Sequence, residues 1–123
     1  MGQKILVVDD SATIRQELRT VLAASGYDVL EAIDGADGAE QIRRSPDMAM
    51  VICDVNMPRM SGIEMVRKVR DGGQNPALPI LMLTTEGSGK IIMEAKAAGA
   101  RGWLVKPFKA DQLIATVKKM ARP

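Results

Sequence analysis

Polar side chains directly follow four short apolar runs of this chain, and their types suit phosphoryl chemistry. In chain order they are Asp9, Asp10, Asp54, Thr84 and Lys106, and the runs are 5–8, 49–53, 80–83 and 102–105. Carboxylates gathered at one place repel one another unless a cation lies between them. Mg²⁺ suits such a site because it prefers oxygen ligands and keeps several waters. If folding brings these residues together, they predict a magnesium-dependent phosphoryl site.

The residue types also predict which chemical role each of these side chains has. Asp54 is the candidate nucleophile toward phosphorus, because it follows a buried run directly and would be rigidly aimed. Asp9 and Asp10 are candidate metal ligands, or groups that orient those ligands. The Thr84 hydroxyl can donate a hydrogen bond, and Lys106 can bring a full positive charge, to phosphoryl oxygens.

The elements that must position these residues alternate along the chain. The wholly apolar runs 5–8, 49–53 and 80–83 predict buried parallel strands. Two more polar runs, 28–32 and 102–105, predict edge strands. Helical patterns lie after each strand: one from the Ser11 N-cap to Gly26, and one over 36–44. The other three contain Ile63, Val66 and Val69; Ile91, Ala95 and Ala98; and Leu113, Val117 and Met120.

This alternation predicts an α/β fold, with residues 1–123 forming one domain. Five β-α units give a doubly wound, five-stranded parallel sheet of the flavodoxin-like type, with right-handed crossovers. Placing the polar strands outermost gives the strand order 2-1-3-4-5. The switch point then lies between the first and third strands. The C-terminal strand ends share one rim, so the polar residues that follow them should converge there.

Composition excludes several classes of protein. Of 123 residues, 46% are hydrophobic and 26% are charged, which is ordinary for a globular domain and too apolar for a disordered chain. No apolar run approaches the roughly 18 residues that cross a bilayer, and the N-terminus lacks a cleavage site. A soluble, cytoplasmic protein without membrane insertion is expected. The absence of histidine excludes His-based metal sites and triads, and the single cysteine, Cys53, excludes an internal disulfide.

Charge is unevenly distributed. Residues 1–89 carry a net charge of −4 and residues 90–123 a net charge of +6. A basic surface of this kind suits an acidic protein partner, nucleic acid, or only solvent. Nucleic acid is disfavoured, because no recognition helix or dimer module remains to be assigned and only 2% of the residues are aromatic.

Five short motifs, in order and on the expected elements, carry a family resemblance. They are VVDDS at 7–11, DVNMP at 54–58, SG at 61–62, LT at 83–84 and VKPF at 105–108. The chain resembles the receiver domains of two-component response regulators, especially the single-domain chemotaxis regulators of the CheY type. That type is itself a standard example of the 2-1-3-4-5 strand order.

The resemblance implies specific residue roles around a phosphoacceptor. Asp54 would accept a phosphoryl group from a kinase phosphohistidine. Mg²⁺ would be bound by Asp10, Asp54 and the backbone carbonyl of Asn56, with Asp9 orienting the metal's waters. Thr84 and Lys106 would sense the phosphoryl group, and the Lys106-Pro107 bond would be cis.

The resemblance also implies a switch and its tuning. Trp103 stands at the position of the family's switching aromatic, and phosphorylation would draw Thr84 inward and let that aromatic rotate. Asn56 and Glu86 match positions that tune hydrolysis. Thr85 stands where many members carry Ala or Gly, and Trp103 replaces the more usual Tyr or Phe.

The predicted function is a non-enzymatic, monomeric switch in chemotaxis. A CheA-like histidine kinase would phosphorylate Asp54, and a protein partner such as a flagellar motor switch protein would bind the face of the fourth helix, fifth strand and fifth helix. A phosphatase is left open as a further partner. Basic groups would steer an acidic partner to that face. The predicted partner face comprises Lys90, Lys96, Arg101, Trp103, Lys109, Lys118 and Lys119.

Three alternatives stay open at this point. A phosphorelay intermediate would pass its phosphoryl group on to a histidine phosphotransfer protein. An aspartate-nucleophile phosphohydrolase would want a second acid where the chain has Asn56, and a cap to select substrate. A flavodoxin-like electron carrier is disfavoured, because Asp9 and Asp10 would repel an FMN phosphate.

Overall fold

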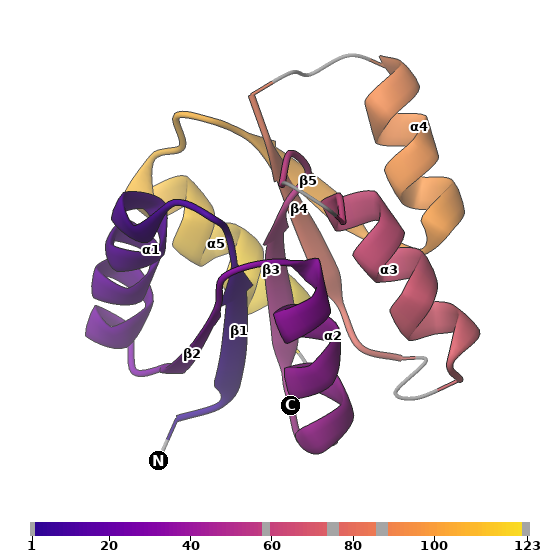
Figure 1. The fold of residues 1–123 in the computed structure, drawn as a ribbon. Helices are drawn as coiled ribbons and strands as arrows, with labels where there is room; N and C mark the ends of the chain where they lie inside the picture. Colours follow the sequence, from indigo (N-terminus) through magenta and orange to yellow (C-terminus); the bar gives the residue numbers. More distant parts are fainter. Residues whose placement is uncertain (1, 58–59, 74–76, 86–88, 122–123) are drawn as a thin grey trace.

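The computed structural model describes residues 2–57, 60–73, 77–85 and 89–121, and within them strands and helices alternate from end to end (Figure 1). The strands are β1 (Lys4–Val8), β2 (Asp28–Ala32), β3 (Met50–Asp54), β4 (Ile80–Thr84) and β5 (Gly102–Val105). The helices are α1 (Ala12–Ala24), α2 (Gly35–Arg44), α3 (Gly62–Asp71), α4 (Gly89–Ala98) and α5 (Ala110–Met120).

The strands form one parallel sheet in the order β2-β1-β3-β4-β5, as predicted. The chain leaves β1 to build β2 on one side, and then crosses back to build β3 on the other. The switch point therefore lies between β1 and β3, where the register pairs Val8 with Cys53. Asp9 and Asp54 each follow one residue later, so the topology places them side by side.

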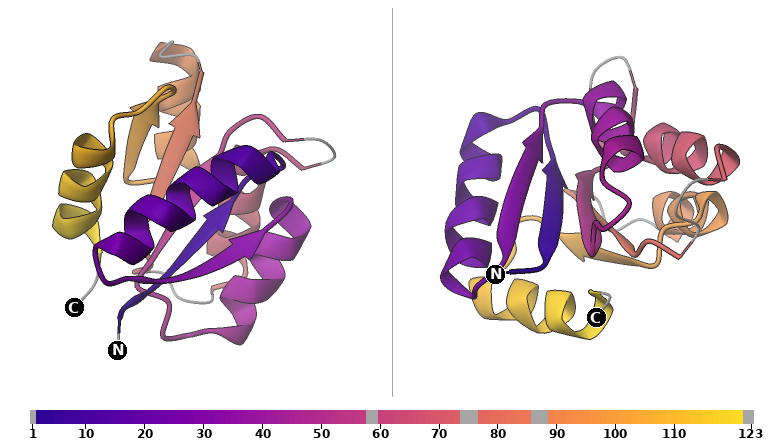
Figure 2. Two further views of the ribbon diagram at one scale, coloured as in Figure 1. Left: turned by 90° about the vertical axis from the view of Figure 1, so that its left-hand side faces the viewer. Right: turned by 90° about the horizontal axis from the view of Figure 1, so that it is seen from below.

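Helices cover both faces of the sheet (Figure 2). On β1, Leu6 and Val8 pack into one buried cluster with α2, α3 and α4, whereas Ile5 and Val7 pack into another with α1 and α5. Because successive side chains of a strand point to opposite faces, a strand covered on both faces must be apolar throughout. This explains the unbroken apolar runs of β1, β3 and β4.

The outer strands are the more polar ones, as predicted. β5 leaves Trp103 37% and Val105 44% exposed, and β2 begins with the exposed Asp28. Polar or exposed residues on edge strands fit the single neighbour that such strands have. Within the described residues, no helix is both long enough and apolar enough to cross a membrane.

Side-chain caps fix where α1, α2 and α3 begin. Ser11 Oγ accepts a hydrogen bond from the Ile14 amide at 3.3 Å and starts α1 as predicted. The second helix starts at Gly35, one residue earlier than the predicted 36–44, because the Asp34 carboxylate caps it. α3 has a reciprocal capping box, in which Ser61 Oγ and the Glu64 carboxylate each accept a backbone amide hydrogen at 3.2 Å.

Candidate functional site

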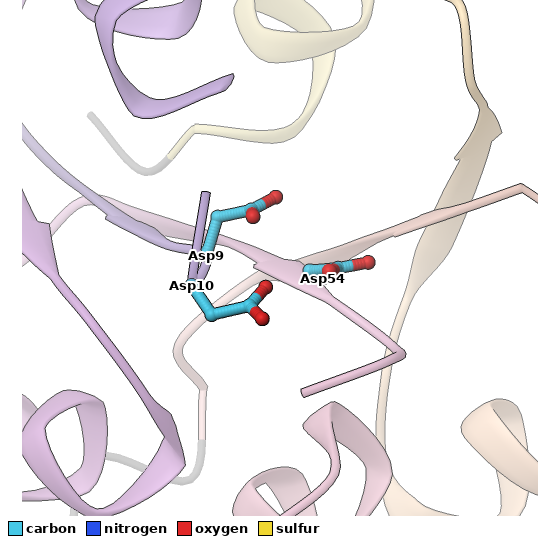
Figure 3. Close-up of side chains that lie close together, drawn as sticks. All are labelled: Asp9, Asp10 and Asp54. Carbon is cyan, nitrogen blue, oxygen red and sulfur yellow. The ribbon is translucent and has the colours of Figure 1, made fainter. Parts of the chain in front are cut away.

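Three carboxyl groups meet at the C-terminal edge of the sheet. Figure 3 shows Asp9 and Asp10 just after β1 and Asp54 at the end of β3. One oxygen from each lies within 4.8 Å of the others. Asp9 is 1% exposed and Asp54 is 5% exposed, whereas Asp10 is exposed. The predicted convergence of these acids is therefore present, with one acid facing solvent and two lying beneath it.

A single ammonium group joins the two buried acids. Lys106 Nζ lies 3.1 Å from Asp9 Oδ2 and 3.2 Å from Asp54 Oδ1. Lys106 is 97 residues from Asp9 in the chain and follows β5 at the far edge of the sheet. Its backbone is held as well, since its amide donates to the Thr84 carbonyl at 2.7 Å. The Lys106-Pro107 peptide bond is cis, as the resemblance implied.

Burial and charge act in opposite directions on these groups. Burial raises the pKa of Asp54, the negative charge of Asp9 raises it further, and Lys106 only partly offsets them. Burial alone would lower the pKa of Lys106, but its attraction to Asp9 and Asp54 prevails and raises that pKa above its ordinary value. Three acids with one ammonium leave an excess of negative charge at this edge.

The donor set fits a hard divalent cation. Carboxylate oxygens are the ligands that Mg²⁺ prefers, and the exposed Asp10 gives access for a cation that keeps several waters. A soft donor, the thiol of Cys53, directly precedes Asp54 in the chain. Cys53 is fully buried, and burial raises the pKa of its thiol, so it stays protonated. The geometry therefore supports the prediction that Mg²⁺ is the metal.

The buried carboxylates differ in how many of their oxygens are occupied. Asp9 Oδ1 accepts the Ser11 amide at 2.9 Å and Asp9 Oδ2 faces Lys106. Asp54 Oδ1 faces Lys106 and also accepts the Asn56 amide at 3.4 Å. Among the described residues, the second oxygen of Asp54 makes no hydrogen bond or ion pair. Asp54 thus keeps one oxygen available for chemistry, whereas Asp9 does not.

Of the other predicted site residues, Thr84 stands at the end of the neighbouring strand and Asn56 just after Asp54. Thr84 ends β4 at 1% exposed, where the register pairs Asp54 with Leu83 and Thr84 with Val105. Asn56 is exposed, two residues after Asp54. Glu86 lies outside the described residues, as does Pro58 of the DVNMP motif.

Trp103, the predicted switching aromatic, lies at the surface of β5. Its side chain is turned far enough outward to be 37% exposed. The ammonium group of Lys96, on α4, lies 4.6 Å from the centre of its ring. This is a cation–π contact that joins α4 to the edge strand.

Two residues that support the site carried no role in the sequence reasoning. Gly62 was only part of a motif, yet a Cβ there would overlap the Asp54 carbonyl oxygen and lie 2.8 Å from Met82 Cε. Arg15 was not singled out at all, although its guanidinium donates to the Asp9 carbonyl at 2.6 Å. The available signal for Gly62 was a glycine next to a helix cap, and for Arg15 a basic residue one turn into the helix that follows the acids.

Comparison with known proteins decides the family. The sequence model of the response regulator receiver domain matches residues 5–118. The chain belongs to this family. Receiver domains of this family are signalling switches; phosphorylation of an aspartate is their general mechanism, and they bind Mg²⁺ at an acidic pocket. In this receiver domain Asp9, Asp10 and Asp54 form an acidic cluster.

Relatives and solved structures agree with this assignment. The receiver domain is 42% identical over 111 residues to the chemotaxis protein CheY1 of Helicobacter pylori strain 26695, covering 89% of this chain and 90% of the relative. It is equally identical to the CheY homolog of Campylobacter jejuni strain 81116, covering 89% and 85%. Chemotaxis protein CheY4 of Vibrio cholerae superposes with a TM-score of 0.92 at 43% identity, covering 98% and 99%. A receiver domain protein of Clostridium thermocellum gives 0.88 at 29%, covering 96% and 93%.

Proposed function

We propose that this receiver domain is a single-domain chemotaxis regulator that accepts a phosphoryl group on Asp54 from a histidine kinase of the CheA kind. The observation that carries the proposal is the arrangement of Lys106 between two buried carboxylates, of which Asp54 alone keeps an oxygen without a partner among the described residues. Such a site binds and orients a phosphoryl group by positioning and charge, which is most of what phosphoryl transfer requires.

Asp54 is the nucleophile in this proposal. Its free oxygen attacks phosphorus, forming a new O–P bond as the bond from phosphorus to the kinase histidine nitrogen breaks. The electron pair of the broken bond stays on that nitrogen. Asp10, Asp54 and the Asn56 carbonyl would hold Mg²⁺, which would supply positive charge to the phosphoryl oxygens. Asp9 keeps its oxygens on the Ser11 amide and Lys106, and would orient the waters of a bound metal.

Lys106 and Thr84 are the groups that detect the product. The Lys106 ammonium, already directed at Asp54, pairs with a phosphoryl oxygen once the carboxylate is modified. The Thr84 hydroxyl, at the end of the neighbouring strand, donates to another. A shift of Thr84 toward the phosphoryl group opens space beside β5, into which Trp103 rotates from its exposed position. Asn56 and Glu86 set how quickly the product hydrolyses.

The output surface of this proposal is the face formed by α4, β5 and α5. β5 is an edge strand, with α4 on one face of the sheet and α5 on the other, so the three present a continuous surface. Its basic residues are all exposed, and they suit an acidic segment of a partner. They are Lys90, Lys96, Arg101, Lys109, Lys118 and Lys119.

The named relatives support chemotaxis as the pathway. Three of them, from Helicobacter pylori, Campylobacter jejuni and Vibrio cholerae, are chemotaxis proteins, and the alignment with CheY1 covers 89% of this chain and 90% of CheY1. We infer a flagellar motor switch protein as the output partner, a cytoplasmic location and a monomeric state. A relay intermediate would instead pass its phosphoryl group to a histidine phosphotransfer protein. The two cases can be told apart by measuring whether the phosphoryl group moves from Asp54 to such a protein.

Intact-protein mass after incubation with acetyl phosphate tests the phosphoacceptor. The natural chain should gain one phosphoryl adduct with Mg²⁺ and none without it, and Asp54→Asn should gain none. Asp71→Asn, which changes an exposed acid at the end of α3, is the matched control and should behave like the natural chain. An adduct that survives in Asp54→Asn, or that forms equally without Mg²⁺, contradicts the proposal.

Two further measurements test the switch and the partner face. Phosphorylation should change the fluorescence and the solvent quenching of Trp103, the only tryptophan. Reversing the charge at Lys90 and Lys118 should weaken binding to a motor switch protein and reduce its salt dependence. Lys68→Glu, at an exposed position of α3, is the control and should leave both unchanged. Fluorescence that phosphorylation leaves unaltered contradicts the proposed rotation of Trp103. Binding that the charge reversal at Lys90 and Lys118 leaves unaltered contradicts the proposed output surface.

A further inference from the structure

Arg15 connects the acidic site to the edge strand β2. Its Nη1 donates to the Asp9 carbonyl at 2.6 Å, and its Nε donates to Glu31 Oε1 at 3.1 Å. The side chain is only 15% exposed. A planar guanidinium with two partners in a fixed geometry holds each of them in place, which a flexible ammonium does not do.

The first of these bonds fixes the peptide between Asp9 and Asp10. The Asp9 amide donates to the Ala32 carbonyl at 3.2 Å, and the Asp9 carbonyl is held by Arg15. The peptide plane that carries this carbonyl ends at the Cα of Asp10, and so sets the direction in which the Asp10 side chain leaves the backbone. Within the described residues, the exposed Asp10 carboxylate makes no hydrogen bond or ion pair. Its position therefore depends on the backbone.

The second bond ties Arg15 to a rigid anchor. Glu31 Oε2 accepts Arg19 Nε at 2.7 Å, and the Glu31 carbonyl accepts Gln41 Nε2 at 2.7 Å, so α1 and α2 both hold this residue. The hydrogen bond from Arg19, with further help from Arg15, keeps the pKa of Glu31 below its usual range, so the anchor stays charged at neutral pH.

We propose that Arg15 is a positioning residue for cation binding, acting through the peptide between Asp9 and Asp10 to place the Asp10 carboxylate. This role rests on the proposed Mg²⁺-dependent function. It concerns the site's readiness before any phosphoryl donor arrives, and so it is measured with Mg²⁺ alone.

Charge and position make opposite predictions for this residue. A positive guanidinium near three acids repels a cation, so losing its charge tightens cation binding if Coulomb energy is all that matters. Losing its geometry weakens cation binding if position matters. Arg15→Lys separates the two, because it keeps the charge but replaces the two-partner guanidinium by a single ammonium.

The test is the apparent dissociation constant of Mg²⁺, obtained from the rise in unfolding temperature across a Mg²⁺ titration. Arg15→Lys should weaken binding about 10-fold, the lower end of what groups behind a metal ligand contribute. Arg19→Lys is the matched control, because Arg19 shares Glu31 but bonds the Val29 carbonyl instead of Asp9. It keeps the bond from Arg15 to the Asp9 carbonyl, and so should lose clearly less Mg²⁺ affinity than Arg15→Lys. Unchanged binding by Arg15→Lys, or an equal loss in Arg19→Lys, overturns the proposal.

A second variant keeps the test decisive if Arg15→Lys fails to fold. Glu31→Gln leaves the guanidinium in place but weakens its anchor, and should weaken Mg²⁺ binding by several-fold. If Glu31→Gln loses Mg²⁺ affinity because Arg15 is displaced, the loss persists at about 1 M salt. If it loses affinity because the negative charge of Glu31 is missing, salt screens the effect and the loss disappears there. Persistence supports the proposal and disappearance overturns it.

Phosphorylation by acetyl phosphate supplies an independent readout. In Arg15→Lys, the Mg²⁺ concentration giving half-maximal labelling should rise, while labelling at saturating Mg²⁺ stays at the natural level. If the natural chain binds Mg²⁺ but is never labelled, the proposed function fails and the role of Arg15 stands. If labelling is normal and Mg²⁺ binding by Arg15→Lys is unchanged, only the role of Arg15 fails.

Discussion

At the scale of single residues, the site depends on negative charges that are buried close together, where they reduce the stability of the fold. Asp54 is 5% exposed, and Asp9 beside it is 1% exposed. Their repulsion is only partly relieved by Lys106, which lies about equally far from both. A cation or a phosphoryl group changes this balance, and that makes the site responsive. The same repulsion makes the ligand-free domain less stable than it would be without the buried charges.

Replacing Asp54 by Asn should therefore stabilise the fold. The raised pKa of Asp54 means that the folded chain holds its proton more tightly than the unfolded chain, so ionisation at neutral pH favours unfolding. We expect Asp54→Asn to raise the free energy of unfolding by on the order of 1 kcal/mol in Mg²⁺-free buffer. Urea denaturation measures this. The exposed control Asp71→Asn should stay within about 0.5 kcal/mol of the natural chain. Destabilisation by Asp54→Asn contradicts this account.

Glu31 predicts the opposite dependence on pH. Its hydrogen bonds to Arg19 and Arg15 lower its pKa from 4.5, so the ionised form stabilises the fold above that pH. The stabilisation is lost as the pH falls below about 4.5. Glu31→Gln should flatten this part of the acid denaturation curve, by less than about 1 kcal/mol because the side chain is 33% exposed. If Glu31→Gln leaves the acid denaturation curve unchanged, the interactions of Glu31 with Arg19 and Arg15 contribute nothing to stability.

At the scale of elements, the close approach of α3 to the end of β3 shapes the site. The Gly62 amide donates to the Val55 carbonyl at 2.9 Å, and the Ser61–Glu64 capping box fixes where the helix starts. This brings the helix backbone against the Asp54 carbonyl with no space for a side chain. A glycine at this position lets the helix begin beside Asp54.

Gly62→Ala should therefore be damaging. The added Cβ overlaps the Asp54 carbonyl oxygen, which is backbone and cannot turn away, so α3 or the end of β3 must shift. We expect a loss of about 2 kcal/mol in the free energy of unfolding, typical of overpacking, together with slower labelling by acetyl phosphate. Gly72→Ala is the control: at the other end of α3, the nearest atoms to its Cβ lie 3.4 Å and 3.6 Å away. Equal effects from both substitutions contradict the steric account.

At the scale of the whole molecule, the sheet gathers residues that the chain keeps far apart. Asp9 and Lys106 are 97 residues apart, yet their side chains lie 3.1 Å from each other. Only a parallel sheet places the ends of β1, β3, β4 and β5 on one edge. A ligand bound at that edge therefore connects the ends of four strands, and should raise the free energy of unfolding of the whole domain.

Mg²⁺ should raise the stability of the entire domain. At ten times its dissociation constant, a cation that binds only the folded chain adds about 1.4 kcal/mol to the free energy of unfolding. Asp10→Asn should remove most of this gain, because it deletes the solvent-facing ligand. Asp47→Asn, an exposed acid just before β3, should leave the gain intact. A gain that Asp10→Asn leaves unaltered places the cation elsewhere.

The sequence by itself determined the strands, their order and the acids at their ends. Wholly apolar runs are required where a sheet is covered on both faces, and more polar runs are tolerated only at its edges. Those two constraints, with the rule that parallel strands end at one rim, were enough to bring Asp54, Thr84 and Lys106 together. The roles assigned to Asn56 and Glu86 came from the resemblance alone and stay predictions.

Only the tertiary structure decided how the site is held. Among the described residues, Asp9 uses both of its oxygens and Asp54 only one, Arg15 holds the Asp9 carbonyl, and Gly62 touches Asp54. Such contacts depend on register and on separations of a few tenths of an ångström. A local pattern of apolar and polar residues encodes which face a side chain occupies, but not the atom that it meets there.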